Sequence, residues 1–172
     1  MNSATILVHY DKLEELIMKT LVAYFSAEHG KTKSVTKSLA SSIGADLFEI
    51  KPERPYSSSD LNYMNPLARC NREHITKKSV PVSERVPEFD QYDIVLIGFP
   101  IWYGCAPNVV GTFCKDYDFS GKKVAAFATS GGSGIGRTAD KLKPFVKGAD
   151  VVDAKLINGA DGSSLRLWVE SL

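Results

Sequence analysis

The residues best suited to binding chemistry lie in residues 26–32, SAEHGKT, directly after a short apolar run. Apolar residues 21–25 indicate a buried strand that stops at Ser26, and helical periodicity begins after the polar segment. A turn with hydroxyl groups and a glycine at the start of a helix leaves backbone N–H groups free, and the helix dipole favours negative charge there. We therefore expect a phosphate group at the end of the first strand.

Two other segments carry unusual side chains at the ends of expected strands. Residues 100–104, PIWYG, place Trp102 and Tyr103 side by side, and residues 129–136, TSGGSGIG, are rich in glycine. The two aromatic rings could offer a flat surface for stacking a planar ligand, or they could close the edge of the core. The glycines could let backbone N–H groups approach a ligand, or they could form a flexible linker.

Three common motifs are excluded by the residue types at a few positions. A Walker A loop ending in residues 30–32 requires glycine where Phe25 stands, and no GxGxxG follows the first strand. Residues 128–132 partly resemble a nucleophile elbow, but an α/β-hydrolase needs a base histidine after the serine. The histidines all come earlier: His9, His29 and His74. The pattern that remains is typical of a site for a mononucleotide with a large planar group.

The composition is that of one ordinary globular domain. Of its 172 residues, 44% are hydrophobic and 24% are charged. No apolar run approaches the roughly 18 residues of a membrane span. A formal net charge of +1 gives no footprint for nucleic acid or for a membrane surface. No metal site is expected, and three cysteines without a CxxC pair favour a reducing cytoplasm: Cys70, Cys105 and Cys114.

The first residues differ in character from the rest of the chain. Residues 1–17 are weakly amphipathic and lack the basic start and apolar middle of a signal peptide. The sequence from Met18 reads like the start of a domain whose first strand begins at once. We therefore expect residues 1–17 to be an N-terminal extension outside the core, and residues 18–172 to form the domain. Removal of the extension should leave folding and ligand binding intact.

Strands alternate with helices along this domain. The pattern predicts strands at residues 21–25, 46–50, 93–99, 123–129 and 151–157. It predicts helices at residues 33–43, 107–117 and 138–146, and a last helix from about residue 162. This order is typical of an α/β fold with a parallel sheet and helices on both faces. In such folds the ligand lies beyond the carboxyl ends of the strands.

Residues 51–90 form a long insert between the second and third strands. Prolines break this stretch repeatedly, and we expect short helices at residues 59–64 and 66–78, followed by an extended tail. Long loops in compact domains are usually functional. The insert, with Tyr56, Tyr63 and Arg69 or Arg72, could cover the ligand or hold a substrate, and it could equally be a packed structural lid.

Several motifs together resemble the flavodoxin family. They are YFSA at residues 24–27, PY, LNY and NRE within residues 55–73, GFPIWYG at residues 98–104 and TSGGSGIGR at residues 129–137. The resemblance covers nearly all of residues 18–172. It implies a three-layer α/β/α fold with a doubly wound, five-stranded parallel sheet of strand order 2-1-3-4-5. It also implies a non-covalently bound FMN.

The resemblance implies that three loops hold the cofactor. The implied FMN-binding residues are Ser26, His29, Gly30, Lys31, Thr32, Pro100, Ile101, Trp102, Tyr103, Gly104, Thr129, Ser130, Gly131, Gly132 and Gly134. The phosphate loop of the family commonly reads S-x-T-G-x-T, and residues 26–32 are one residue longer. Glu28 would repel a phosphate in this loop unless its side chain points away.

FMN would make the chain an electron-transfer protein that shuttles single electrons between redox partner proteins. The alternative is an NAD(P)H-dependent, FMN-containing quinone or flavin reductase, because both functions need the same cofactor site. A flavin-free interaction module on the same fold is a third reading. We expect a monomer or a weak dimer, with no nucleic-acid or membrane partner.

Overall fold

Five parallel strands form one sheet in the computed structural model, which describes residues 18–27 and 30–172. The strands are β1 (Thr20–Tyr24), β2 (Asp46–Glu49), β3 (Ile94–Pro100), β4 (Lys123–Thr129) and β5 (Asp150–Leu156). Their spatial order is β2-β1-β3-β4-β5, and every neighbouring pair is parallel. The predicted sheet and its strand order are confirmed. Residues 1–17 lie outside the described residues, so the expectation for them stays a prediction. Glu28 and His29 lie outside the described residues as well.

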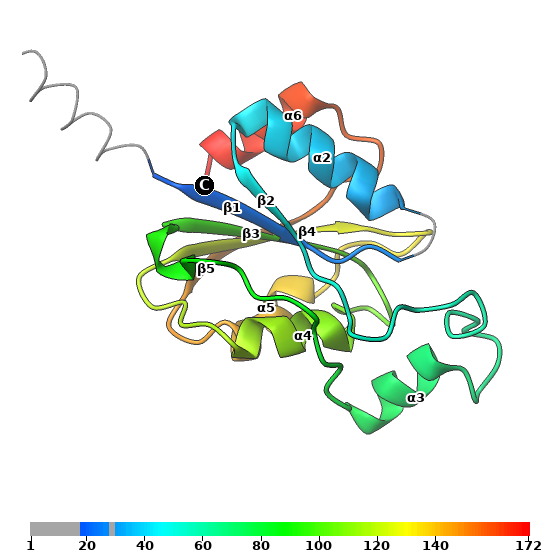
Figure 1. Ribbon diagram of the computed structural model, residues 1–172. Coiled ribbons are helices and arrows are strands. Elements are labelled where there is room, and N and C mark those ends of the chain that lie inside the picture. Colours follow the sequence, from blue (N-terminus) through cyan, green and yellow to red (C-terminus); the bar gives the residue numbers. More distant parts are fainter. Residues whose placement is uncertain (1–17, 28–29) are drawn as a thin grey trace, which may run out of the picture.

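Helices cover both faces of the sheet (Figure 1), which confirms the three-layer prediction. The helices α2 (Lys31–Ile43) and α6 (Gly162–Glu170) lie on one face, and α4 (Asn108–Lys115) and α5 (Thr138–Leu142) lie on the other. Successive side chains of a strand point to opposite faces, so β1 supplies both cores. Val22 and Tyr24 pack in the cluster that includes residues of α2 and α6, whereas Leu21 and Ala23 pack in the cluster with residues of α4 and α5.

The position of each strand follows from its residues. Central β3 is apolar and buried from Ile94 to Phe99, as a strand covered on both faces should be. β2 forms an edge of the sheet and is partly exposed, which agrees with its weaker apolar pattern. At the end of α2, Gly44 adopts φ 65°, and its N–H bonds to the carbonyl of Ala40, so the predicted helix stop is confirmed.

The insert leaves the sheet after β2 and returns to it before β3. An antiparallel bridge between Pro52 and Val82 closes its base, and the backbone hydrogen bonds from Glu53 N to Pro81 O and from Ser83 N to Lys51 O flank the bridge. Its helix α3 (Arg69–Thr76) lies beside the main body in Figure 1. A 3₁₀ turn (Phe89–Gln91) then leads into β3, and another (Lys143–Phe145) extends α5.

The prediction of a helix at residues 59–64 is wrong, because this stretch forms successive turns. Its polar side chains bond to nearby backbone groups and so compete with helical hydrogen bonds. Asp60 Oδ2 accepts from Ser57 N at 3.1 Å, and Asn62 Oδ1 accepts from Met64 N at 3.2 Å. The second predicted helix, residues 66–78, is shorter than expected because Ala68 is extended and α3 begins only at Arg69.

No helix among residues 18–27 and 30–172 is long and apolar enough to cross a membrane.

Gly98 in β3 is paired with Phe127 in β4, and a side chain at position 98 has no room. A Cβ atom there would lie 2.2 Å from Phe127 Cζ. We expect Gly98→Ala to lower the free energy of unfolding by about 3 kcal/mol, measured by urea denaturation, because an overfilled core forces its neighbours to shift.

Gly134→Ala is the matched control, because nothing lies within 4 Å of a Cβ at that position. Adding Phe127→Leu to Gly98→Ala should cost less than the sum of the two single changes, since the second change makes room for the first. Equal destabilisation by Gly98→Ala and Gly134→Ala would contradict this packing.

Candidate functional site

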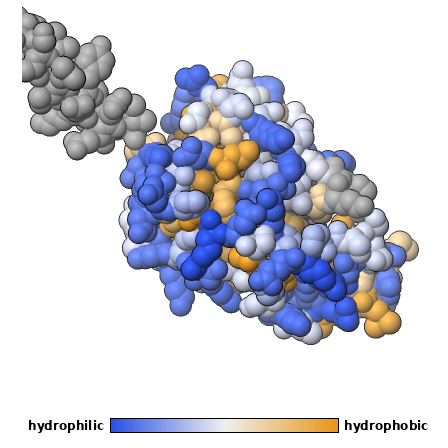
Figure 2. Space-filling view, viewed as in Figure 1, coloured by the Kyte–Doolittle hydropathy of each residue, from blue (hydrophilic) through white to orange (hydrophobic). Residues whose placement is uncertain are grey.

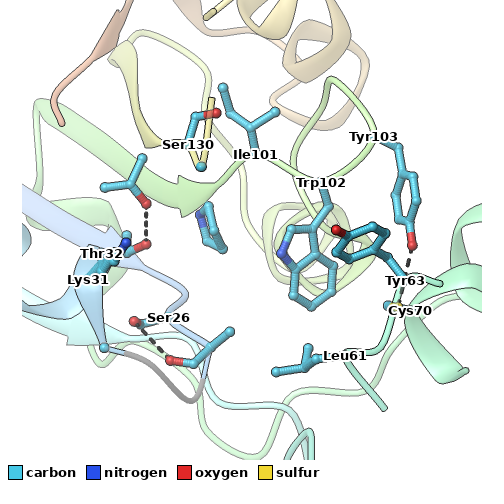
Figure 3. A pocket seen from close by; sticks show the side chains of 15 residues that line it. Ser26, Lys31, Thr32, Leu61, Tyr63, Cys70, Ile101, Trp102, Tyr103 and Ser130 are labelled. Carbon is cyan, nitrogen blue, oxygen red and sulfur yellow. Dashed lines mark hydrogen bonds between the residues drawn. The ribbon is translucent and has the colours of Figure 1, made fainter. Parts of the chain in front are cut away.

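A cavity of about 580 Å³ opens at the carboxyl ends of β1, β3 and β4. Its volume falls in the usual range of small-molecule sites, roughly 300–1,000 Å³. The loop after each of these strands lines it, and the insert supplies a further wall. Figure 3 shows Ser26, Lys31 and Thr32 on one side, with Trp102 and Tyr63 on the opposite side. The cavity therefore has a polar end at α2 and an aromatic end at the loop after β3.

The polar end is formed by the start of α2. Gly30 adopts a left-handed conformation, φ 64°, before the first helical residue, which a residue with a side chain rarely adopts. Ser26 Oγ accepts a hydrogen bond from Lys33 N at 3.2 Å. The N–H groups of Lys31 and Thr32 bond to none of the described residues. Two backbone donors without a described partner, a hydroxyl group and the positive end of the helix dipole would therefore suit an anion at this end.

The two lysines of this first helical turn differ in their partners. Lys33 Nζ lies 2.8 Å from Glu49 Oε2, so its charge is balanced by a carboxylate of β2. Lys31 is exposed, lines the cavity and forms no ion pair with a described residue. Of these two cations, Lys31 is the one available to an anion in the cavity.

A buried pair of hydroxyl groups joins the first loop to the third. Thr32 Oγ1 and Thr129 Oγ1 are 2.8 Å apart, and the two residues are only 2% and 6% exposed. The carbonyl of Thr129 also accepts a hydrogen bond from Ile101 N at 2.8 Å, which joins the third loop to the second. Thr129 therefore fixes the relative positions of all three loops.

The loop after β3 forms a tight reverse turn. Trp102 and Cys105 exchange two backbone hydrogen bonds of 3.0 Å, with Tyr103 at φ 53° and Gly104 at φ 71° between them. Two consecutive positive φ angles define a type I′ turn, which favours glycine at its second central position. Lys141 Nζ donates to the carbonyl of Gly104 at 2.9 Å. Gly104 thus shapes the turn and does not line the cavity.

Trp102 is held in place by aromatic neighbours. Phe25 and Tyr56 contact it edge to face, with ring centroids 5.6 and 5.3 Å from that of Trp102. The guanidinium group of Arg69 lies over the Tyr56 ring, 4.0 Å from the ring centroid. The Tyr56 hydroxyl group donates a hydrogen bond to Glu73 at 2.5 Å. Burial and the Glu73 carboxylate raise the pKa of Tyr56 far above its ordinary value, so the phenol stays protonated. The insert thereby supports the aromatic end of the cavity.

Tyr103 also faces the insert. Its ring stacks on His74 with centroids 4.3 Å apart, and its hydroxyl group donates to Asn71 Oδ1 at 2.5 Å. Burial and the neighbouring Cys70 thiol raise the pKa of Tyr103. One face of this ring is therefore occupied by protein, while the residue still lines the cavity.

The glycine-rich loop after β4 is folded back on the side chain of Ser130. Ser130 Oγ accepts hydrogen bonds from Gly132 N at 3.1 Å and Ser133 N at 2.8 Å. Asn158, just after β5, bonds to both backbone groups of Ser130: its Oδ1 accepts from Ser130 N at 2.9 Å, and its Nδ2 donates to Ser130 O at 2.7 Å. This clamp fixes the loop where Gly131 meets the cavity.

The structure brings together most of the residues expected from the sequence. Around the cavity lie Ser26, Gly30, Lys31, Thr32, Pro100, Ile101, Trp102, Tyr103, Thr129, Ser130 and Gly131. Three other expected residues do not line the cavity: Gly104 in the turn after β3, and Gly132 and Gly134 in the loop after β4. The backbone of this turn and of this loop runs away from the cavity at these positions. His29 lies outside the described residues.

Three residues that the sequence analysis did not name also line the cavity: Ala27, Leu61 and Cys70. Tyr63, one of the insert residues that could cover a ligand, lines it too. Ala27 lies within the segment already suspected of binding phosphate. Leu61 and Cys70 belong to the insert, Leu61 in turns that give no periodic signal and Cys70 in the first turn of α3. Asn158 was missed as well, because an asparagine after a strand is typical of an ordinary turn.

We expect Thr32→Val to lower the free energy of unfolding by roughly 1–3 kcal/mol, because it leaves the buried Thr129 hydroxyl group without its partner. Urea denaturation measures the change. The double variant Thr32→Val with Thr129→Val should recover most of the loss, since two apolar groups of the same shape replace the pair. A double variant less stable than the single one would show that the pair does not act as a unit.

Comparison with known proteins places the chain in a family. The flavodoxin family model matches residues 19–172, and the chain belongs to this family. A protein of Bacteroides eggerthii, inferred to be a flavoprotein, is 37% identical with a TM-score of 0.84, and the match covers 89% of this chain and 96% of that one. A protein of Bacteroides uniformis with the same description is 34% identical with a TM-score of 0.83, over 89% and 98% of the two chains.

A flavoprotein of Lactobacillus acidophilus, solved in complex with FMN, shares the fold. It is 23% identical with a TM-score of 0.68, and the match covers 88% of this chain and 99% of that one. None of the curated proteins compared with the chain matches it.

Proposed function

We propose that this protein binds FMN non-covalently in the cavity and carries single electrons between redox partner proteins. One observation supports this proposal above the others: three loops from three neighbouring strands surround one cavity with an anion-binding end and an aromatic end. FMN has the matching parts, a phosphate and a planar ring system. The FMN complex of the related fold from Lactobacillus acidophilus adds support.

The phosphate would lie at the start of α2. The N–H groups of Lys31 and Thr32 and the hydroxyl group of Ser26 would donate to its oxygens, and Lys31 would balance part of its charge. Ser26 Oγ accepts from Lys33 N and donates to Ala27 O over a long 3.4 Å, so its hydrogen would turn from this carbonyl to the phosphate. The anion therefore meets backbone donors whose directions the fold has already fixed.

The ring would lie at the other end, against Trp102 and the loop after β4. Aromatic contact contributes about 0.5–1.5 kcal/mol beyond burial, and Gly131 lets the backbone come close. Bound flavin supplies the redox chemistry, and the protein binds it, orients it and limits its contact with water. Phe25 and Tyr56 hold Trp102, so the wall facing the ring does not have to be ordered when the ligand binds.

A carrier and a stand-alone reductase both need the same flavin site, and membership of the flavodoxin family supports the carrier. Free thiols at Cys70, Cys105 and Cys114 support a reducing compartment such as the cytoplasm. Rapid NADPH oxidation by the FMN-loaded protein with a quinone, and without a separate reductase, would favour the reductase instead.

The phosphate site is tested by comparing FMN with riboflavin, which has the same ring and no phosphate. We expect the protein to bind FMN far more tightly, measured by quenching of flavin fluorescence. Ser26→Ala should weaken FMN binding roughly tenfold or more, because a hydrogen bond to a charged group contributes about 1.5–3 kcal/mol. It should leave the weak riboflavin binding unchanged.

Ser41→Ala is the matched control, since Ser41 is an exposed serine near the other end of α2. It should alter neither affinity. Equal affinity of the wild-type protein for FMN and riboflavin would contradict a phosphate site at α2, and binding of neither flavin would overturn the proposed function.

A further inference from the structure

The insert exposes large apolar side chains next to the cavity. Four large apolar side chains within a stretch of 13 residues are 73–79% exposed: Tyr63, Met64, Leu67 and Ile75. Figure 2 shows apolar side chains among polar ones at the end of the molecule that carries α3. Single exposed apolar residues are common, but a group of this kind beside a ligand site indicates an interaction surface.

Hydrogen bonds from one side chain hold this surface in shape. Asn71 Nδ2 donates to Tyr63 O at 2.9 Å and to Asn65 O at 2.7 Å, which fixes the turn before α3 against the helix. Ile75 lies one helical turn after Asn71, and Arg72 and Ile75 are neighbours on the exposed face of α3. The apolar side chains are therefore presented by a fixed backbone.

The charged groups of this surface have one sign. Arg72, Lys77 and Lys78 are exposed, and none forms an ion pair with a described residue. Glu73 is the one acidic residue between positions 61 and 80, and its side chain, 12% exposed, is paired with Arg69 at 2.5 Å. His74 lies near Lys77 and Lys141, and burial together with these two cations lowers its pKa. We call Tyr63, Met64, Leu67, Ile75, Arg72, Lys77 and Lys78 the insert patch.

The insert patch meets the rim of the cavity. Tyr63 belongs to both, and Tyr103, which lines the cavity and is 40% exposed, is tied to Asn71 behind the patch. A protein bound to the patch would lie beside the opening. This is the position from which it could exchange electrons with a ligand in the cavity.

We propose that the insert patch docks an acidic electron-transfer protein, whose carboxylates surround a small apolar contact area. This inference rests on the proposed function for its choice of partner. Opposite charges speed and orient the encounter, and the apolar centre supplies contact area once the two proteins meet. The same charges disfavour a second copy of this chain, because a symmetric dimer through the patch would bring cations against cations.

The experiment measures docking directly, with and without FMN. The probe is an acidic plant-type [2Fe–2S] ferredoxin, and isothermal titration calorimetry gives its Kd. We expect binding at about 10 mM salt that weakens at least tenfold at about 150 mM salt, because the screening length falls from ~30 to ~8 Å. A basic cytochrome c should not bind.

Two matched double variants separate the patch from the net charge. Arg72→Glu with Lys78→Glu should weaken ferredoxin binding about tenfold or more at low salt. Lys37→Glu with Lys147→Glu changes the net charge equally, at exposed positions on α2 and before β5, and should weaken it less than about threefold. Met64→Ser with Ile75→Ser should weaken binding at both salt concentrations, since it removes apolar contact.

Equal effects of the two charge variants would overturn the proposal, because binding would then follow net charge alone. Equal binding of cytochrome c would overturn it as well, as would capture of the protein by phosphatidylserine vesicles without any binding of ferredoxin. Because the protein without FMN is also measured, failure of the proposed function would show as failure to bind FMN, whereas failure of this inference would show in the Kd values.

Discussion

The site depends on one residue, Thr129, which ties together three loops that are far apart in the sequence. Its hydroxyl group pairs with Thr32 at the start of α2, and its carbonyl accepts from Ile101 after β3. Both bonds are made at the carboxyl end of β4, where the parallel register also places the ends of β1 and β3. A polar group buried in this position is costly unless it is paired, so the loops are held in one arrangement. That arrangement gives the cavity its polar and aromatic ends.

The insert supplies a further wall of the cavity that the three loops form. Its base is closed by the bridge between Pro52 and Val82, and the ion pair of Arg69 and Glu73 supports Tyr56 against Trp102. Breaking one member of such a pair would leave an uncompensated charge, so these side chains maintain the shape of the aromatic wall. The outer side of the same segment exposes cations and apolar groups. One insert thus shapes the ligand site from within and offers a surface to a partner from outside.

Much of this architecture could be predicted from the sequence because its signals are local. The apolar run of β3, the glycine that ends α2 and the alternation of strands with helices are each set by neighbouring residues. The loops after β1, β3 and β4 could be grouped because parallel strands end at one edge. The sequence alone could therefore predict that three loops form the site.

The insert could not be predicted in the same way, because its contacts are non-local. Leu61 and Tyr63 lie in turns held by Asn and Asp side chains, which give no apolar periodicity, and Cys70 reaches the cavity from the first turn of α3. The expected helix at residues 59–64 is absent for the same reason. In the loop after β4, which glycine meets the cavity is decided by Ser130 and by Asn158, a residue 28 positions away.

The most direct test of the account is an NMR titration of the ¹⁵N-labelled protein with FMN. If the three loops hold one ligand, the amide signals of Thr32 and Gly131 and the indole signal of Trp102 should shift together, with the same dependence on FMN concentration. Shifts confined to one loop, or to the outer face of α3, would contradict a shared site.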